Sequence, residues 1–135
     1  MAQAQSPERP LSPHLQVWRW HVTMATSILH RAAGIALYVG VMALVVWLCA
    51  LVAGPDLWVG LMTAVPGFAI EALVYAMTAV LAFHLANGVR HLFFDVGSGF
   101  KPAAANATAW LAILFAIAAP IALFVLLHVV RAADL

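Results

Sequence analysis

Histidines recur at helical spacing within an otherwise apolar part of this sequence. In HLANGVRHLFFD, residues 84–95, His84, Gly88 and His91 stand at i, i+4 and i+7, so a helix places them on one face. A neutral imidazole deep in a membrane is a good axial ligand for haem iron, and a glycine one turn away leaves room for a flat macrocycle. A lone histidine in a membrane helix can instead hydrogen-bond to a neighbouring helix. Spacing alone leaves both roles open for His84.

His84 and His91 cannot ligate the same haem iron. Axial ligands approach the iron from opposite sides, whereas these two side chains share a face of one helix. His30 lies at a comparable depth and could supply the second ligand. His128 lies near the far end of its apolar stretch, which is too distant, so we expect an interfacial or subunit-contact residue there, or part of a separate outer site.

A second polar group lies in SILHR, residues 27–31. Ser27, His30 and Arg31 stand at i, i+3 and i+4 and therefore share a helix face. A guanidinium and a hydroxyl can hydrogen-bond a quinone carbonyl or receive a carboxylate such as a haem propionate. Alternatively, Arg31 extends to the membrane surface while the other two satisfy neighbouring groups. An arginine at the centre of a span costs at least about 2.5 kcal/mol, so its depth favours a functional role.

The carboxylates near the apolar stretches suggest no catalytic acid. We expect Glu71, at the start of the second stretch, to be solvated at the membrane surface. Asp95 is expected to pair with Arg90 or to cap a loop. No phosphate-binding loop, dinucleotide fingerprint, nucleophile elbow or zinc motif is present in the sequence. We therefore predict no catalytic residue.

The composition places this chain in a lipid bilayer. Of its 135 residues, 66% are hydrophobic and 8% are charged. The mean hydropathy is +1.03, far outside the range of soluble globular proteins. A formal net charge of +1 provides no basic surface that would favour nucleic acid. Cys49 is the single cysteine, so neither an intrachain disulfide nor a thiolate metal cluster can form.

Three stretches are long and apolar enough to cross the membrane, which takes about 20 residues each. We expect helices over about 23–54, 67–92 and 108–130, after a cytoplasmic N-terminal arm over 1–22. Pro120 is expected to kink the third helix without ending it. The expected fold is an all-α membrane protein with three transmembrane helices and a single domain over residues 1–135.

The distribution of Lys and Arg predicts the orientation, because cytoplasmic flanks carry the excess. Arg9 and Arg19 precede the first helix, and Arg90 and Lys101 stand near the end of the second. The loop between the first and second helices has neither residue type. We therefore place the N-terminus inside, in the cytoplasm or matrix, and the C-terminus outside.

The segments RPLSPHLQVWRW, SILHRAAG and HLANGVRHLFFDVG, in this order on a three-span chain, resemble the cytochrome b subunit of succinate dehydrogenase. The similarity covers most of residues 1–100, and the third helix fits by hydropathy alone. The resemblance implies a second small membrane anchor subunit, an iron–sulfur subunit and a flavoprotein subunit as partners. It also implies one haem b shared between the two membrane chains, ubiquinone as substrate, and a chain that is not catalytic alone.

The resemblance further implies roles for individual residues. The histidine of the H-x-x-x-G-x-R-H pattern, here His84, is the expected metal ligand, and the partner chain supplies the second ligand. Ser27 and Arg31 are expected to bind quinone, while His30 and Arg31 meet the haem propionates. The predicted haem-binding set is His30, Arg31, His84, Gly88 and His91.

Three alternatives stand beside this hypothesis. The anchor of a fumarate reductase uses a similar architecture in the opposite chemical direction. A small membrane transporter or channel subunit would use His84, Arg31 and Glu71 as an ion path, but the outer half of the first helix carries no polar stripe to complete it. A purely structural anchor would bind no haem. The expected location is a bacterial inner membrane or the mitochondrial inner membrane.

Overall fold

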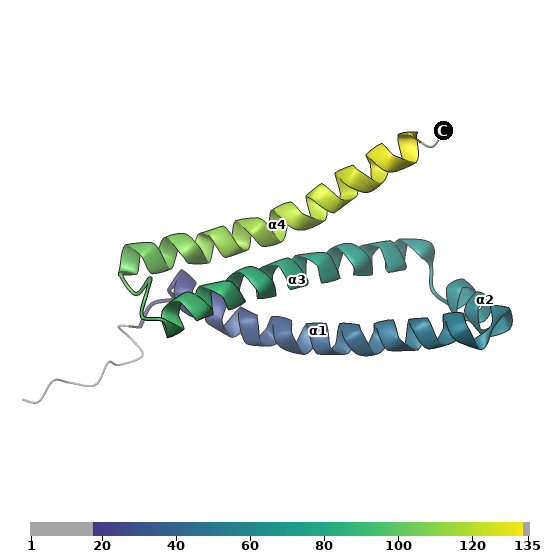
Figure 1. The fold of residues 1–135 in the computed structure, drawn as a ribbon, viewed down its shortest axis with the longest axis horizontal. Coiled ribbons are helices and arrows are strands. Elements are labelled where there is room, and N and C mark those ends of the chain that lie inside the picture. The colour runs from purple at the N-terminus through teal and green to yellow at the C-terminus, as the bar shows by residue number, and fades with distance from the viewer. Residues whose placement is uncertain (1–17, 134–135) are drawn as a thin grey trace, which may run out of the picture.

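Four helices make up the part of the chain that the computed structural model describes, residues 18–133 (Figure 1). Most of the expected N-terminal arm, including Arg9, falls on residues 1–17 and lies outside the described residues. In chain order the helices are α1 (Val22–Ala53), α2 (Pro55–Ala64), α3 (Gly67–Asp95) and α4 (Pro102–Ala133).

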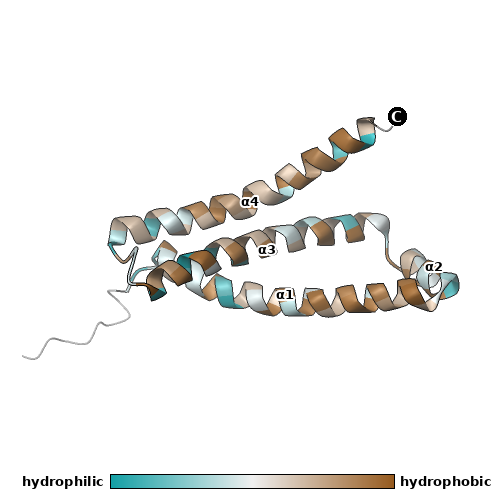
Figure 2. Cartoon of the chain, in the orientation of Figure 1, coloured by the Kyte–Doolittle hydropathy of each residue, from teal (hydrophilic) through white to brown (hydrophobic). Residues whose placement is uncertain are grey.

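Three of these helices, α1, α3 and α4, are long and apolar enough to cross a membrane. The predicted class, an all-α protein with three transmembrane helices, is therefore confirmed. Figure 2 shows apolar residues continuing along all three, with hydrophilic residues gathered towards the helix ends. The helix α4 begins at Pro102 rather than near Thr108, because the intervening AAANATA is rich in alanine, the residue with the highest helix propensity.

The short helix α2 was not expected from the sequence. Gly54 adopts φ 122° and ψ 170°, a conformation that only glycine accepts readily, and it ends α1. Pro55 then occupies the first turn of α2, where a missing N–H costs nothing. Trp47 of α1 and Trp58 of α2 pack edge to face, with ring centroids 5.2 Å apart. The chain therefore turns at the end of α1 through a folded helix rather than an open loop.

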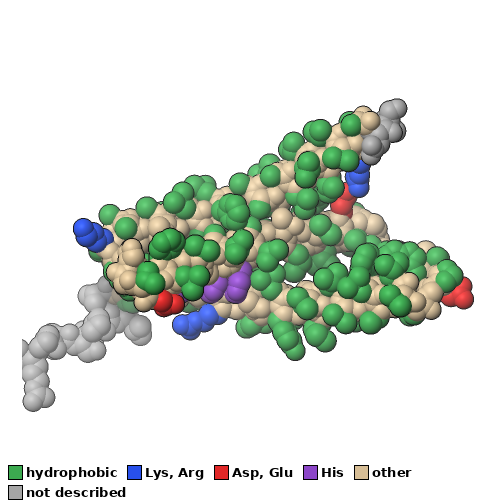
Figure 3. Space-filling model, in the orientation of Figure 1, with side chains coloured by type: hydrophobic (Ala, Val, Ile, Leu, Met, Phe, Trp, Pro, Cys, Tyr) green, Lys and Arg blue, Asp and Glu red, His purple; other side chains and the backbone are tan. Residues whose placement is uncertain are grey.

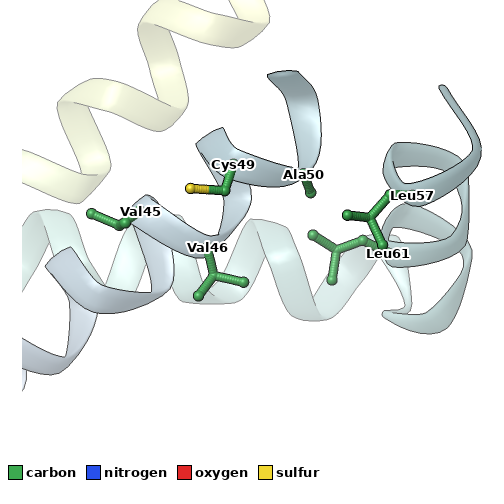
Figure 4. A pocket seen from close by; sticks show the side chains of 6 residues that line it. All are labelled: Val45, Val46, Cys49, Ala50, Leu57 and Leu61. Carbon is green, nitrogen blue, oxygen red and sulfur yellow. The ribbon is translucent and has the colours of Figure 1, made fainter. Parts of the chain in front are cut away.

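The α1–α2 corner encloses a small apolar pocket of about 260 Å³. Figure 4 shows its lining side chains, which are Val45, Val46, Cys49, Ala50, Leu57 and Leu61. Cys49 is a free, exposed thiol among these side chains. The lining is therefore apolar throughout, with no charged group.

The long helices pack through small residues. Helix α3 lies between the other two and contacts both α4 and α1, whereas α1 and α4 meet less extensively. The buried apolar side chains are Ala33, Ala50, Ala82, Phe83, Ala109 and Ala112. Small side chains allow helix backbones to approach closely where no hydrophobic effect drives them together. Most large apolar side chains are exposed on the outside of the bundle.

The bundle has two ends with different character. At one end α1 begins, α3 ends and α4 begins; it carries His30, His84 and His91, and we call it the histidine end (Figures 1 and 3). At the other, the α2 end, α1 ends, α3 begins and α4 ends. Helix α4 continues through Pro120, as predicted, and Figure 1 shows it diverging from α3 towards the α2 end.

Candidate functional site

Three histidines from two helices stack against one another at the histidine end. The rings of His30 on α1 and His84 on α3 have centroids 4.0 Å apart and planes inclined by 15°. The His91 ring, also on α3, lies 5.0 Å from the His30 ring at an inclination of 23°. Figure 3 shows the histidines gathered at this end. The structure thus brings together the three histidines that the sequence singled out in the first two long helices.

The imidazole of His84 is oriented by the backbone of α1. Its Nδ1 lies 3.3 Å from the carbonyl oxygen of His30, to which it donates as the protonated nitrogen. This bond leaves Nε2 with a free lone pair, the arrangement that metal-binding histidines use when a carbonyl fixes the other nitrogen. The His30 ring lies against the face of the His84 ring, so it does not occupy the direction of the Nε2 lone pair. His84 is therefore poised to give one nitrogen to a metal.

Two glycines permit the histidines to approach so closely. A Cβ atom on Gly34 would lie 3.3 Å from Cε1 of His84, closer than most van der Waals contacts. A Cβ on Gly88 would lie 3.8 Å from Cε1 of His30, an ordinary contact distance. Gly88 thus faces the His30 ring. A side chain at Gly34, by contrast, would press on His84 in its present position.

The site is suited to giving a haem one ligand rather than a full set. Among residues 18–133, no group of three His, Cys, Asp or Glu side chains could hold a metal ion. A haem iron needs a single nitrogen from this chain if another chain supplies the second. His30 Nδ1 is buried and has no hydrogen-bond partner within this range. An added carboxylate could accept its proton, so the residues present fit a haem with its propionates.

Ser27 and Arg31 occupy different surroundings although they share a helix face. Ser27 is half-buried and lines a groove of about 450 Å³ between the three long helices. The other lining residues are Thr23, Met24, Arg90, His91, Phe94, Phe100 and Ala105. Arg31 does not line this groove, and its side chain is exposed on α1. A ligand that bound both residues would extend from the groove towards the outer face of α1.

A buried polar network that was not expected from the sequence lies beside this groove. Arg90 is only 6% exposed, and Asn87 and Thr26 are fully buried. The Arg90 guanidinium donates to Asn87 Oδ1 at 3.3 Å and to Thr108 Oγ1 at 3.1 Å. Asn87 Nδ2 donates to the carbonyl of Thr26 at 3.2 Å, which links α3 to α1. The i, i+3 spacing of Asn87 and Arg90 within an apolar helix was the available signal, since polar residues in a span need partners.

The expectations for the two carboxylates have different outcomes. The expected pair between Asp95 and Arg90 is wrong, because Arg90 turns into the bundle to bond Thr108 and Asn87, while Asp95 is exposed at the end of α3. Glu71 is exposed, as expected, and lies 3.7 Å from Arg131 at the α2 end.

His128 lies exposed on α4, far along the helix from the three stacked histidines. Its Nδ1 bonds the carbonyl of Phe124 at 2.9 Å, within its own helix. It also packs on the Phe124 ring, with centroids 3.9 Å apart. The structure thus does not bring His128 to the histidine end.

Comparison with known proteins yields relatives of one kind. The chain is 34% identical over 110 residues to the succinate dehydrogenase cytochrome b556 subunit of Rickettsia prowazekii, covering 82% of this chain and 86% of that protein. It is 37% identical over 101 residues to the subunit of the same name in Paracoccus denitrificans, covering 75% and 78%. It is 36% identical over 96 residues to the human mitochondrial cytochrome b560 subunit, covering 69% and 56%.

The family match covers nearly the whole chain. Residues 5–128 match the model of the succinate dehydrogenase/fumarate reductase transmembrane subunit. This range includes α1, α2 and α3 and most of α4, and it contains all three stacked histidines. With three helices able to span a bilayer and with bacterial and mitochondrial relatives that are succinate dehydrogenase cytochrome b subunits, the chain belongs to the succinate dehydrogenase/fumarate reductase transmembrane subunit family.

Proposed function

We propose that this chain is the haem b-binding membrane-anchor subunit of a succinate:quinone oxidoreductase. It contributes part of the quinone site and assists electron transfer from succinate to ubiquinone. The names of the relatives, which are cytochrome b subunits of succinate dehydrogenase, support this assignment. The observation that carries it is the orientation of His84, whose Nδ1 is held by the His30 carbonyl and whose Nε2 is free.

In this proposal His84 Nε2 would ligate the haem iron, and a second small membrane subunit would supply the other ligand. The haem supplies one-electron redox chemistry when bound. His30 Nδ1, buried without a partner in the described chain, donates a hydrogen bond to a propionate. Arg31 contributes a positive charge from the exposed face of α1. His91 and Gly88 support the ring of His30 from α3.

The quinone site uses Ser27 and Arg31. The Ser27 hydroxyl lines the groove and can donate to a quinone carbonyl. The Arg31 guanidinium, one turn further along the same face of α1, would bind the same headgroup outside the groove. Quinone dissolves in the bilayer, whereas succinate does not. Oxidation of succinate therefore takes place on flavoprotein and iron–sulfur subunits outside the lipid, and this chain alone is not catalytic.

The orientation follows from the same proposal. The histidine end faces the cytoplasm or matrix, where the soluble subunits dock, and the C-terminus lies on the opposite side. Arg19 and Lys101 flank the histidine end, in agreement with the excess of basic residues on the inner side of a membrane. Charge on the flanks therefore supports the docking side that the haem and quinone assignments require.

The test is the haem spectrum of the assembled complex with His84→Ala. We expect loss of the absorption of low-spin, bis-histidine haem, because one axial ligand is missing. His128→Ala is the matched control, since this histidine is exposed on α4 at the other end of the bundle and should leave the spectrum unchanged.

A normal haem spectrum in His84→Ala would overturn the ligand assignment. His30→Ala distinguishes the remaining possibility, in which the ligand comes from α1. We expect this variant to keep bis-histidine haem with lowered occupancy, because it loses a propionate contact and not the iron ligand.

A further inference from the structure

A buried arginine in a membrane helix requires partners, and Arg90 finds them within the described chain. Its three hydrogen bonds there go from Nε to Thr108 Oγ1, from Nη1 to Asn87 Oδ1 and from Nη2 to the carbonyl of Ala105. Its Cζ lies 4.5 Å from the centroid of the Phe94 ring, which adds a cation–π contact. All three acceptors are neutral, and two of them belong to α4. The planar guanidinium therefore joins α3 to α4 through two hydrogen bonds.

The hydrogen-bonded chain continues from Arg90 to the first helix. Asn87 accepts from Arg90 and donates to the carbonyl of Thr26 on α1, both inside the bundle. Thr108 accepts from Arg90 while its own hydroxyl proton returns to the carbonyl of Ala104 at 3.0 Å. Residues from all three long helices are thus joined in one polar network, with Arg90 at its centre.

The network borders the groove that contains Ser27, and Arg90 itself lines that groove. Thr26 precedes Ser27 in α1, and Arg90 precedes His91 in α3, so the network is directly joined to two further lining residues. His91 is held further by its Nδ1, which donates to the Asn87 carbonyl at 2.7 Å. A groove of about 450 Å³ is within the range of small-molecule sites. The spacing between its walls depends on the bonds that join the helices behind them.

We propose that Arg90 is a positioning residue for the quinone headgroup. It holds α1, α3 and α4 at a fixed separation and so keeps in place Ser27 and His91, which both line the groove. This inference rests on the proposed function, in which Ser27 bonds the quinone. Although Arg90 lines the groove, it is only 6% exposed and its guanidinium bonds protein acceptors, so it acts through its neighbours.

The experiment measures the KM and kcat of quinone reduction in the assembled complex, with a short-chain ubiquinone analogue. Arg90→Gln should raise KM about tenfold with a smaller change in kcat, since the loss of hydrogen bonds to a charged donor corresponds to roughly that factor. Haem content and succinate oxidation by a soluble artificial acceptor should persist. Arg131→Gln is the matched control, because that arginine is 66% exposed at the other end of α4, and its KM should equal that of the wild type.

A milder pair of variants tests the same contact if Arg90→Gln prevents assembly. Thr108→Val removes the acceptor of Arg90 Nε and nearly preserves side-chain shape, so KM should rise about threefold, as expected for one hydrogen bond of modest net value. Thr108→Ser retains the hydroxyl and should restore a KM near the wild-type value. This rescue is specific to the hydrogen bond and would not follow from a general loss of packing.

Two results would overturn the proposal. If Ser27→Ala raises KM while Thr108→Val and Arg90→Gln do not, Ser27 binds quinone without help from Arg90. If Ser27→Ala also leaves KM unchanged, the groove does not bind quinone, and the proposed quinone assignment fails together with this inference. A fall in kcat and haem content with a constant KM would equally overturn it, because that pattern reflects fewer assembled complexes.

Discussion

Two arginines at opposite ends of the bundle, Arg90 and Arg131, have opposite surroundings. Arg90, at the histidine end, is 6% exposed and bonds only neutral acceptors. Arg131, at the α2 end, is 66% exposed and lies 3.7 Å from the carboxylate of Glu71. The pair of Arg131 with Glu71 is exposed, and exposed ion pairs contribute little to the free energy of folding.

This difference separates an end of the bundle with buried, hydrogen-bonded polar groups from an end whose charged groups are exposed. At the histidine end Thr26, Asn87 and Arg90 are buried, and the hydrogen bonds that they make join all three long helices. Helix α4 diverges from α3 towards the α2 end, where apolar side chains dominate (Figures 1 and 2). Substitutions at the histidine end should therefore have larger consequences than comparable ones at the α2 end.

Arg31→Ala should have the largest effect on quinone reduction. Losing a hydrogen bond to a charged donor costs about 1.5 to 3 kcal/mol, or roughly tenfold to a hundredfold in quinone affinity or turnover. Ser27→Ala should cost less, and Arg31→Lys should recover activity only in part, because an ammonium lacks the planar fork. Succinate oxidation with a soluble acceptor should be retained. Normal quinone reductase activity in both alanine variants would assign this face to packing alone.

Asn87→Leu should give the next largest effect, on stability. It removes the bond to the Thr26 carbonyl and an acceptor of Arg90, and interhelix bonds in membranes contribute about 0.6 kcal/mol each on average and up to about 1.7. We therefore expect a loss of about 1 to 3 kcal/mol, measured as a lower unfolding temperature of the complex in detergent. Asn106→Leu is the control, since Asn106 is exposed on α4. Equal effects of the two variants would contradict the comparison between buried and exposed polar groups.

Gly34→Ala should disturb the haem site to a smaller extent. The new Cβ would lie 3.3 Å from Cε1 of His84, so the imidazole must shift by a few tenths of an ångström, at a cost of about 1 kcal/mol. We expect a shifted haem absorption band or lower haem occupancy. Gly88→Ala is the graded comparison, because its Cβ would meet His30 at an ordinary 3.8 Å and should change the spectrum less. The reverse order would mean that Gly88 borders the haem directly.

Glu71→Gln should have the smallest effect. Both members of its pair with Arg131 are more than half exposed, so the loss of charge should change stability by less than about 0.5 kcal/mol. Unfolding of the complex and its haem spectrum should match those of the wild type. A marked loss of stability would show that the α2 end depends on its ion pair, against the contrast drawn between the two ends.

The amino-acid pattern alone was sufficient to predict an all-α membrane protein and its three long helices. A run of about 20 apolar residues can satisfy its backbone in lipid only as a helix or a closed barrel, so hydropathy decides the class before any packing is known. The helical period also placed His84 and His91 on one face, and both rings do meet His30. Helix α2 escaped prediction because its existence depends on the turn at Gly54, whose positive φ is a property of the folded chain.

Which polar groups meet across helices was decided only by the tertiary structure. Periodicity gives a residue's face on its own helix but not the rotation of that helix against its neighbours. Asp95 was expected to pair with Arg90 or to cap a loop. The pairing does not form, because the packing of α4 against α3 offers Arg90 the hydroxyl of Thr108 instead. The same packing leaves Arg31 exposed and buries Asn87, two residues that hydropathy ranks alike as unfavourable in lipid. Whether a polar residue is buried depends on the neighbouring helix, and the sequence of a single helix does not determine how that neighbour packs.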